Sequence, residues 1–173
     1  MKKKSNRCNN MKPTMKITIL TVGRVKEKFY QGAVLEFQKR LSRYVKLEII
    51  EVEDEKTPEE AAENEKNQIK MKEGKRLMKH ISKDAYVISL AIEGKMLDSV
   101  ELSKKICLLG VNGKNHIIFI IGGSLGLSNE ILNQSDLLLS FSKMTFPHQL
   151  MRVILLEQIY RSCRIIHHEP YHK

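Results

Sequence analysis

Short apolar runs alternate along the chain with longer segments in which apolar residues recur every three or four positions. The short runs are rich in β-branched residues and predict five strands, at residues 16–22, 46–52, 85–92, 115–123 and 136–142. The remaining segments predict helices over 26–43, from Pro58 onward, over 99–110 and 128–135, and from Pro147 to about Ile166. This alternation indicates an α/β fold with a mostly parallel sheet flanked by helices.

The helix predicted from Pro58 onward is unusually charged. Thr57 has the side chain of an N-cap, and proline is common at the first position of a helix. Acidic residues in its first turns and basic residues in its later turns suit the helix dipole. We expect a solvated helix in which few residues touch the core: Ala62, Ile69, Leu77 and Met78.

The last predicted helix is apolar on nearly all sides, yet it contains Arg152, Glu157 and Arg161. Such a helix is buried on several sides, either at the centre of its own domain or against a partner chain. Its charges need partners, because unpaired buried charges are costly. Glu157 has the spacing to pair with Arg161 or Arg152, or to pair across a two-fold axis. We favour the interpretation in which this helix forms a dimer interface.

The positive charge of the chain is concentrated at its beginning. The 173 residues carry a formal net charge of +10, and residues 1–14 contain five basic residues and no acidic one. We expect residues 1–14 to be a disordered extension, and residues 15–173 to form a single domain. The remaining +5 suits a nucleic-acid partner, although charge alone is weak evidence.

Several classes of protein are disfavoured by the same pattern. The longest apolar runs are far too short to span a bilayer, so we expect no membrane association. The basic start is not followed by the apolar segment of a signal peptide, so we expect a cytoplasmic protein. The six histidines and three cysteines show no metal-ligand spacing, so we expect no metal.

Three predicted strands end in unusual sequences, and ligands of parallel sheets bind beyond such carboxyl ends. The strand at 85–92 runs into Glu93 and Gly94, the strand at 115–123 runs into glycines, and "FSKMTF" follows the fifth. The glycine segment has neither a dinucleotide nor a P-loop pattern, which disfavours those nucleotide sites. The glycines alone favour a tight turn over a ligand-binding loop.

Four blocks of the sequence resemble one known family. They are "MKITILTVGR", "KMLDS", "IIFIIGGSLGL" and the long block "LSFSKMTFPHQLMRVILLEQIYRSCRII" with its tail "PYHK". They are similar to bacterial SPOUT-class methyltransferases that methylate N3 of a pseudouridine in large-subunit ribosomal RNA. The resemblance covers Met15 to Lys173. It implies S-adenosylmethionine as cofactor, a deep C-terminal trefoil knot, and a homodimer packed through the C-terminal helix.

The resemblance also implies which residues form the site. The cofactor pocket is expected to be lined by Leu90, Gly122, Phe141, Ser142, Lys143, Met144, Thr145 and Phe146. Tyr171, His172 and Lys173 are expected to close over the cofactor or the target base, within one chain or from the opposite protomer, and His148 and Arg152 to position RNA. His168 stands where family members often have glycine.

The activity implied by the resemblance is methyl transfer to ribosomal RNA. Because the family lacks a separate RNA-binding domain, we expect the dimer to dock on an assembled ribosome. One alternative is a non-enzymatic RNA- or ribosome-binding factor on the same fold, against which the intact "FSKMTFPHQ" and "PYHK" argue. Another is a SPOUT enzyme acting on transfer RNA, against which the lack of an added domain argues.

Overall fold

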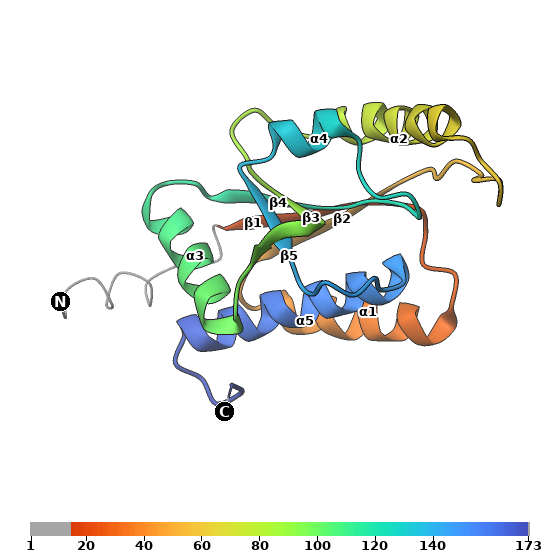
Figure 1. Ribbon diagram of the computed structural model, residues 1–173. Helices are drawn as coiled ribbons and strands as arrows, with labels where there is room; N and C mark the ends of the chain where they lie inside the picture. Colours follow the sequence, from red (N-terminus) through yellow and green to blue (C-terminus); the bar gives the residue numbers. More distant parts are fainter. Residues whose placement is uncertain (1–14, 173) are drawn as a thin grey trace.

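The structure, a computed structural model, describes residues 15–172. The prediction for residues 1–14 and the role expected of Lys173 lie outside this range. The elements alternate as expected (Figure 1): β1 (Lys16–Val22), α1 (Lys28–Leu41), β2 (Lys46–Val52), α2 (Glu63–Met78), β3 (Tyr86–Met96), α3 (Ser99–Val111), β4 (His116–Ile121), α4 (Asn129–Gln134), β5 (Leu137–Ser140) and α5 (His148–Ile166).

The five strands form one sheet in the order β2-β1-β4-β3-β5, and every neighbouring pair is parallel. The predicted mostly parallel sheet is therefore confirmed. β1 and β4 occupy the interior and are apolar along most of their length, as expected for strands covered on both faces.

Helices cover both faces of the sheet (Figure 1): α1, α3 and α5 lie on one face, and α2 and α4 lie on the other. Side chains of β4 alternate between the two resulting cores. Ile117, Phe119 and Ile121 pack in the core under α1, α3 and α5. Ile118 and Ile120 pack in the core under α2 and α4. This alternation follows from the two-residue period of a strand.

The start of α2 differs from the prediction. The helix begins at Glu63 with Ala62 as its N-cap residue, five residues later than the expected first position. Thr57 does not cap a helix, because its hydroxyl lies 3.2 Å from the hydroxyl of Ser124. Pro58 instead begins a turn closed by the Ala61 N–H. Ile69 and Leu77 are buried as expected, whereas Ala62 is exposed.

The end of β3 also differs, because the strand continues to Met96. Leu139 of β5 pairs with both Leu90 and Lys95, so the intervening β3 residues bulge out of the ladder. Gly94 permits this arrangement: a Cβ atom there would lie 2.7 Å from the carbonyl carbon of Leu138. β3 and β5 are thereby packed backbone to backbone, which fixes the position of the segment that follows β5.

Candidate active site

The sheet order brings the residues expected to bind the cofactor to one edge. β4, β3 and β5 are neighbours, and their carboxyl ends lie together because the strands are parallel. Leu90 pairs with Leu139 near the end of β5, Gly122 directly follows β4, and the loop 141–146 directly follows β5. The topology therefore places all three segments on the same side of the sheet.

The glycines after β4 form a tight turn. The N–H of Gly126 donates to the carbonyl of Gly123 at 3.1 Å, and Gly126 has a φ of 82°. Gly122 has no room for a side chain, because a Cβ atom would lie 2.7 Å from the carbonyl carbon of Gly126. The tight turn considered from the sequence is thus present, and it limits Gly122 to contacts through its backbone.

The loop after β5 is held by its own serines. The hydroxyl of Ser140 donates to the carbonyl of Ser142 at 3.1 Å, and the N–H of Met144 donates to the hydroxyl of Ser142 at 3.0 Å. Lys143, Met144 and Thr145 are exposed, and Met144 is 72% exposed. An ordered backbone with an exposed apolar side chain suits a surface that closes on a ligand.

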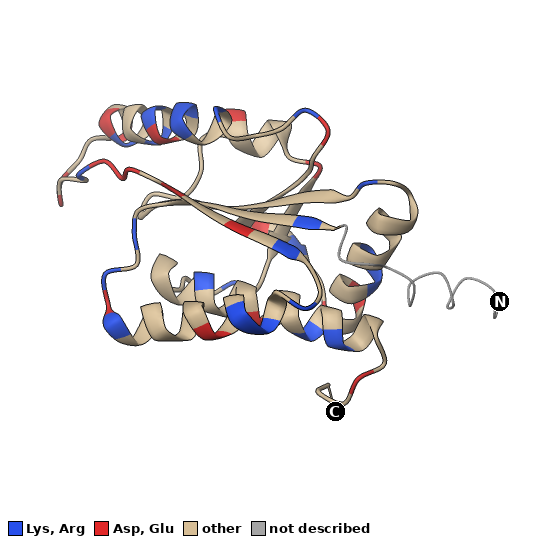
Figure 2. Cartoon of the chain, turned by 180° about the vertical axis from the view of Figure 1, so that it is seen from behind, with Lys and Arg blue, Asp and Glu red and all other residues tan. Residues whose placement is uncertain are grey.

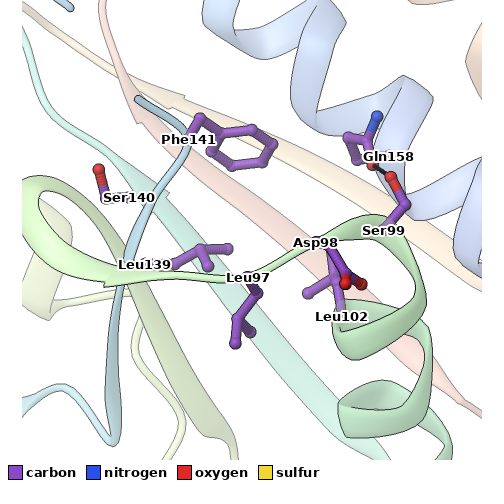
Figure 3. A pocket seen from close by; sticks show the side chains of 8 residues that line it. All are labelled: Leu97, Asp98, Ser99, Leu102, Leu139, Ser140, Phe141 and Gln158. Carbon is purple, nitrogen blue, oxygen red and sulfur yellow. Dashed lines mark hydrogen bonds between the residues drawn. The ribbon is translucent and has the colours of Figure 1, made fainter. Parts of the chain in front are cut away.

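A cavity of about 290 Å³ adjoins this loop. It lies between the start of α3, the end of β5 and the middle of α5 (Figure 3), and is lined by Leu97, Asp98, Ser99, Leu102, Leu139, Ser140, Phe141 and Gln158. The hydroxyl of Ser99 donates to Gln158 Oε1 at 2.7 Å across its wall. Its volume is close to the lower limit for small-molecule sites. Phe141 is the lining residue that the sequence analysis had assigned to the cofactor.

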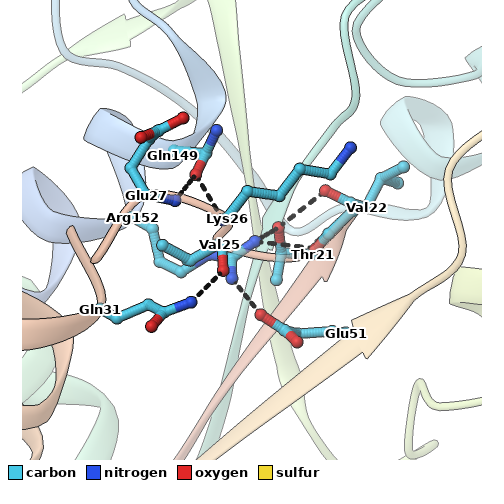
Figure 4. Close-up of polar contacts among 10 residues, drawn as sticks. Thr21, Val22, Val25, Lys26, Glu27, Gln31, Glu51, Gln149 and Arg152 are labelled. Atoms are coloured by element: carbon cyan, nitrogen blue, oxygen red, sulfur yellow. Dashed lines mark hydrogen bonds and ion pairs between the residues drawn. The ribbon is translucent and has the colours of Figure 1, made fainter. Parts of the chain in front are cut away.

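Arg152 is fully buried and anchors the start of α5 to the ends of β1 and β2 (Figure 4). Its guanidinium pairs with Glu51 and donates to Thr21 Oγ1 at 2.9 Å and to the carbonyl of Gly23 at 3.0 Å. Burial lowers the pKa of Arg152, and Glu51 opposes that shift. Of the pairings considered for Glu157, the one with Arg161 is present, at 2.6 Å.

Two further residues of α5 face the segment between β1 and α1. Gln149 Oε1 accepts from the N–H groups of Lys26, at 2.7 Å, and Glu27, at 3.3 Å, which fastens the entry to α1 (Figure 4). His148 lies beside Gly23, and burial followed by the positive charge of Arg152 lowers the pKa of its imidazole. His148 is therefore a neutral side chain at neutral pH, directly after the loop expected to bind the cofactor.

The C-terminal tail folds back along the second half of α5. The hydroxyl of Tyr171 donates to Glu157 Oε1 at 3.2 Å, its ring centroid lies 5.0 Å from that of Tyr160, and Arg161 lies 4.7 Å from the Tyr171 ring centroid. His172 is exposed. Glu157 and Arg161 lie nine and thirteen residues after the start of α5, so Tyr171 lies roughly 14 to 20 Å along the helix from the loop at its start.

Comparison with known proteins decides the family. A family model described as a predicted SPOUT methyltransferase matches residues 15–172. The chain belongs to the SPOUT methyltransferase family. It is 64% identical over 159 residues to a ribosomal RNA large subunit methyltransferase H of Bifidobacterium adolescentis, covering 92% of this chain and 100% of that relative. The protein of the same name from Clostridium kluyveri is 57% identical with the same coverage.

The SPOUT fold is also found among solved structures. A probable methylase family protein from Haemophilus influenzae Rd KW20 aligns with a TM-score of 0.51 and 13% identity, covering 92% of this chain and 70% of that one. At this identity the likeness bears on the fold alone. The trefoil knot stays a prediction from the resemblance.

Within this SPOUT domain, sequence reasoning missed most of the cavity lining. Leu97, Asp98 and Ser99 belong to the "KMLDS" block, which contributed to the resemblance without being assigned a role. Nothing in the sequence marked Gln158 as a site residue, because a polar residue in an apolar helix can equally lie on an exposed edge of that helix. Among residues 15–172, no group of three His, Cys, Asp or Glu side chains could hold a metal ion. No helix in that range is long and apolar enough to cross a membrane.

Proposed function

We propose that this protein transfers a methyl group from S-adenosylmethionine to N3 of a pseudouridine in large-subunit ribosomal RNA, as a homodimer in the cytoplasm. The observation that carries this proposal is the 64% identity over the full length of a ribosomal RNA large subunit methyltransferase H. Because the alignment covers 100% of that relative, its catalytic residues lie within the part that matches this chain. Membership of the SPOUT methyltransferase family supports the reaction class.

The site has the chemistry that a nucleoside-containing cofactor needs. The cavity lining combines apolar side chains, which suit an adenine ring, with the hydroxyl, amide and carboxylate groups that suit ribose hydroxyls. Leu90, the Gly122 backbone and the loop 141–146 would hold the cofactor next to this cavity. When bound, S-adenosylmethionine supplies a methyl group on a positively charged sulfur. The protein must exclude water from that methyl group and align the target nitrogen behind it.

The target nitrogen must lose a proton during the transfer. His148 is the described side chain near the loop that burial keeps neutral, so it is able to accept a proton or to hydrogen-bond the base. Arg152, which the resemblance assigns to positioning RNA, is fully buried, and its two terminal nitrogens bind Glu51, Thr21 and the Gly23 carbonyl. We assign Arg152 to positioning the start of α5, and we expect alignment to supply most of the rate.

Two features of α5 support the proposed dimer: the side chains along its half-exposed side, and the positions of the tail and the cofactor loop along it. Apolar side chains on the half-exposed side of this helix, Met151, Ile154 and Ile165, recur with Arg161 at spacings that suit a helix interface. Tyr171 lies against the middle and second half of α5, and the cofactor loop lies at the start of this helix. An antiparallel pairing of two α5 helices would bring Tyr171 of one chain toward the loop of its partner.

The test is methylation of ribosomes isolated from cells that lack this modification, with radiolabelled S-adenosylmethionine and mass spectrometry of the nucleosides. We expect label in 3-methylpseudouridine, and faster incorporation into assembled ribosomes than into free ribosomal RNA. Label in a different nucleoside would refute the target. Equal rates on ribosomes and free RNA would refute the assembled substrate, and no transfer to either would refute the activity.

A further inference from the structure

The positive charge of the described chain is concentrated on α2 and the turn that follows it. Residues 66–83 contain seven lysines and arginines and a single acidic residue, Glu73, which is a net charge of +6. Residues 15–172 together contain 24 basic and 20 acidic residues, a net charge of +4. The rest of the described chain is therefore slightly negative, and this segment accounts for the entire positive excess.

The lysines of this segment point away from the sheet. Ile69, Glu73 and Leu77 recur every four residues and form the buried side of α2. Lys72, Lys75 and Lys79 recur every three or four residues on another side and are exposed, and the exposed Lys83 follows one turn later. We call these four residues the α2 lysine face. Figure 2 shows α2 in an outer layer of the molecule, with several of its positions in the blue of Lys and Arg.

Most of the α2 lysine face has no acidic partner. Lys72 lies 3.7 Å from Glu55, but no carboxylate among residues 15–172 is within salt-bridge distance of Lys75, Lys79 or Lys83. Like charges at these spacings destabilise a helix by about 0.2–0.5 kcal/mol per pair. Repulsion between the unpaired lysines therefore destabilises the free protein slightly, and a bound polyanion would offset this repulsion.

We propose that the α2 lysine face binds the phosphate backbone of ribosomal RNA and thereby docks the enzyme on its substrate. This inference rests on the proposed function for its choice of partner. The part of the face from Lys72 to Lys79 is about 10 Å long, and Lys83 lies beyond it, which is enough to contact consecutive phosphates. Phosphate contacts position a protein without reading sequence, so they complement recognition of the target base at the active site.

The position of α2 leaves its lysines open to a large partner. α2 follows β2, so it begins at the carboxyl edge of the sheet where the cofactor residues lie, and the α2 lysine face lies on its later part, toward the edge where β3 begins. It covers the face opposite to α1, α3 and α5 (Figure 1). A dimer packed through α5 therefore leaves the α2 lysine face of both protomers accessible.

The experiment measures binding to ribosomes by cosedimentation from about 50 to about 200 mM salt. The test variant carries Lys75→Gln, Lys79→Gln and Lys83→Gln. The matched control carries Lys28→Gln, Lys104→Gln and Lys114→Gln, which removes three exposed lysines from α1, α3 and the following turn. Each lost phosphate contact lowers the salt slope by roughly 0.7–0.9, so the test variant's slope should be shallower by about 2 to 3.

We expect the test variant to bind ribosomes at least about tenfold more weakly near 50 mM salt, while the control and the affinity of all proteins for S-adenosylmethionine stay unchanged. An unchanged slope, or an equal loss in the control, would overturn the proposal. A test variant that binds ribosomes more weakly but binds free ribosomal RNA as well as the wild-type protein does would also overturn the proposal. It would indicate that the lysines bind an acidic protein. Binding needs no methyl transfer: a wild-type protein that docks through this face without methylating would refute the proposed function alone.

Discussion

At the scale of single residues, the buried Arg152 makes a sharp prediction. Its guanidinium is 0% exposed and holds Glu51, Thr21 and Gly23 together. Arg152→Met should lower the free energy of unfolding by about 3 kcal/mol, because two buried acceptors and the partly exposed carboxylate of Glu51 lose their donor. Arg161→Met should cost less than about 1 kcal/mol, because its pair with Glu157 is partly exposed. Urea denaturation measures both, and equal losses would contradict the assignment.

Glu73 should make stability depend on pH. It is 4% exposed, one carboxylate oxygen accepts from the Glu55 N–H at 3.0 Å, and the other has no partner. Burial raises its pKa from the ordinary 4.5, and the charges of Asp54 and Glu55 add to the shift. The folded state thus keeps a proton that the unfolded chain releases. The resulting stability is present below pH 4.5 and is lost as pH rises through the folded pKa.

Glu73→Gln removes this titration and keeps an oxygen that can accept from Glu55. Relative to the wild-type protein, the variant should therefore gain stability between about pH 5 and about pH 8. Urea denaturation at several pH values measures the difference between the two proteins. A difference that is constant over this range, or that shrinks as pH rises, would show that Glu73 does not titrate as proposed.

His168 is the non-glycine residue with positive φ among residues 15–172, at 55°. Glycine, which the resemblance leads us to expect here, would suit this backbone better, since a Cβ atom strains the left-handed region. His168→Gly should raise the free energy of unfolding by up to about 1 kcal/mol, and His167→Gly, at φ −89°, should lower it. Thermal denaturation compares the two. Stabilisation by both substitutions would point to a cause other than backbone strain.

At the scale of elements, periodicity predicted most of the fold. α5 was expected from Pro147 to about Ile166 and is observed from His148 to Ile166. The agreement is good because a proline often starts a helix and the long apolar segment after it favours helix throughout. The start of α2 was wrong because Thr57 and Pro58 also suit a turn. The extension of β3 was missed because "EGKM" is polar, and its pairing depends on contact with β5.

The expected cofactor residues and the cavity differ in how far the sequence could place them. Parallel strands bring Leu90, Gly122 and the loop 141–146 to one edge, which follows from strand order once the sheet is known. The cavity was not predictable, because Ser99 and Gln158 meet across 59 positions of sequence. Likewise, Arg152 reaches Glu51 across 101 positions, so its role as an anchor could not be read from local pattern.

The turn after β4 gives a prediction at this scale. Gly122→Ala places a Cβ atom 2.7 Å from the Gly126 carbonyl carbon, so the turn must open and the strand ends must shift. We expect S-adenosylmethionine affinity, measured by calorimetry, to fall at least about tenfold, which is about 1.4 kcal/mol. Gly32→Ala, in α1 with no atom within 4 Å of the added Cβ, should keep the affinity and stabilise the helix. Wild-type affinity in Gly122→Ala would remove this turn from the cofactor site.

At the scale of the whole molecule, the proposed antiparallel pairing of two α5 helices predicts a site shared between two chains. Two variants test this: one lacks residues 171–173, and the other carries Gly122→Ala and is assayed at an S-adenosylmethionine concentration too low to saturate it, so that neither is active alone. If the tail acts on its partner, a mixed dimer keeps one complete site, so an equal mixture should recover about a quarter of wild-type methylation. If the tail acts within its own chain, the mixture stays inactive. Each variant alone provides the control.

The sheet order also has a consequence for biosynthesis. β1 is made first but lies inside the sheet, and its Lys16 pairs with His116, 100 residues later. At about 5 to 20 residues per second, about 5 to 20 s pass before β4 is available. During that time one edge of an apolar strand lacks its neighbour and can pair with other chains. Newly made molecules are therefore most prone to aggregation before β4 emerges, and chaperones that cover β1 should raise the yield.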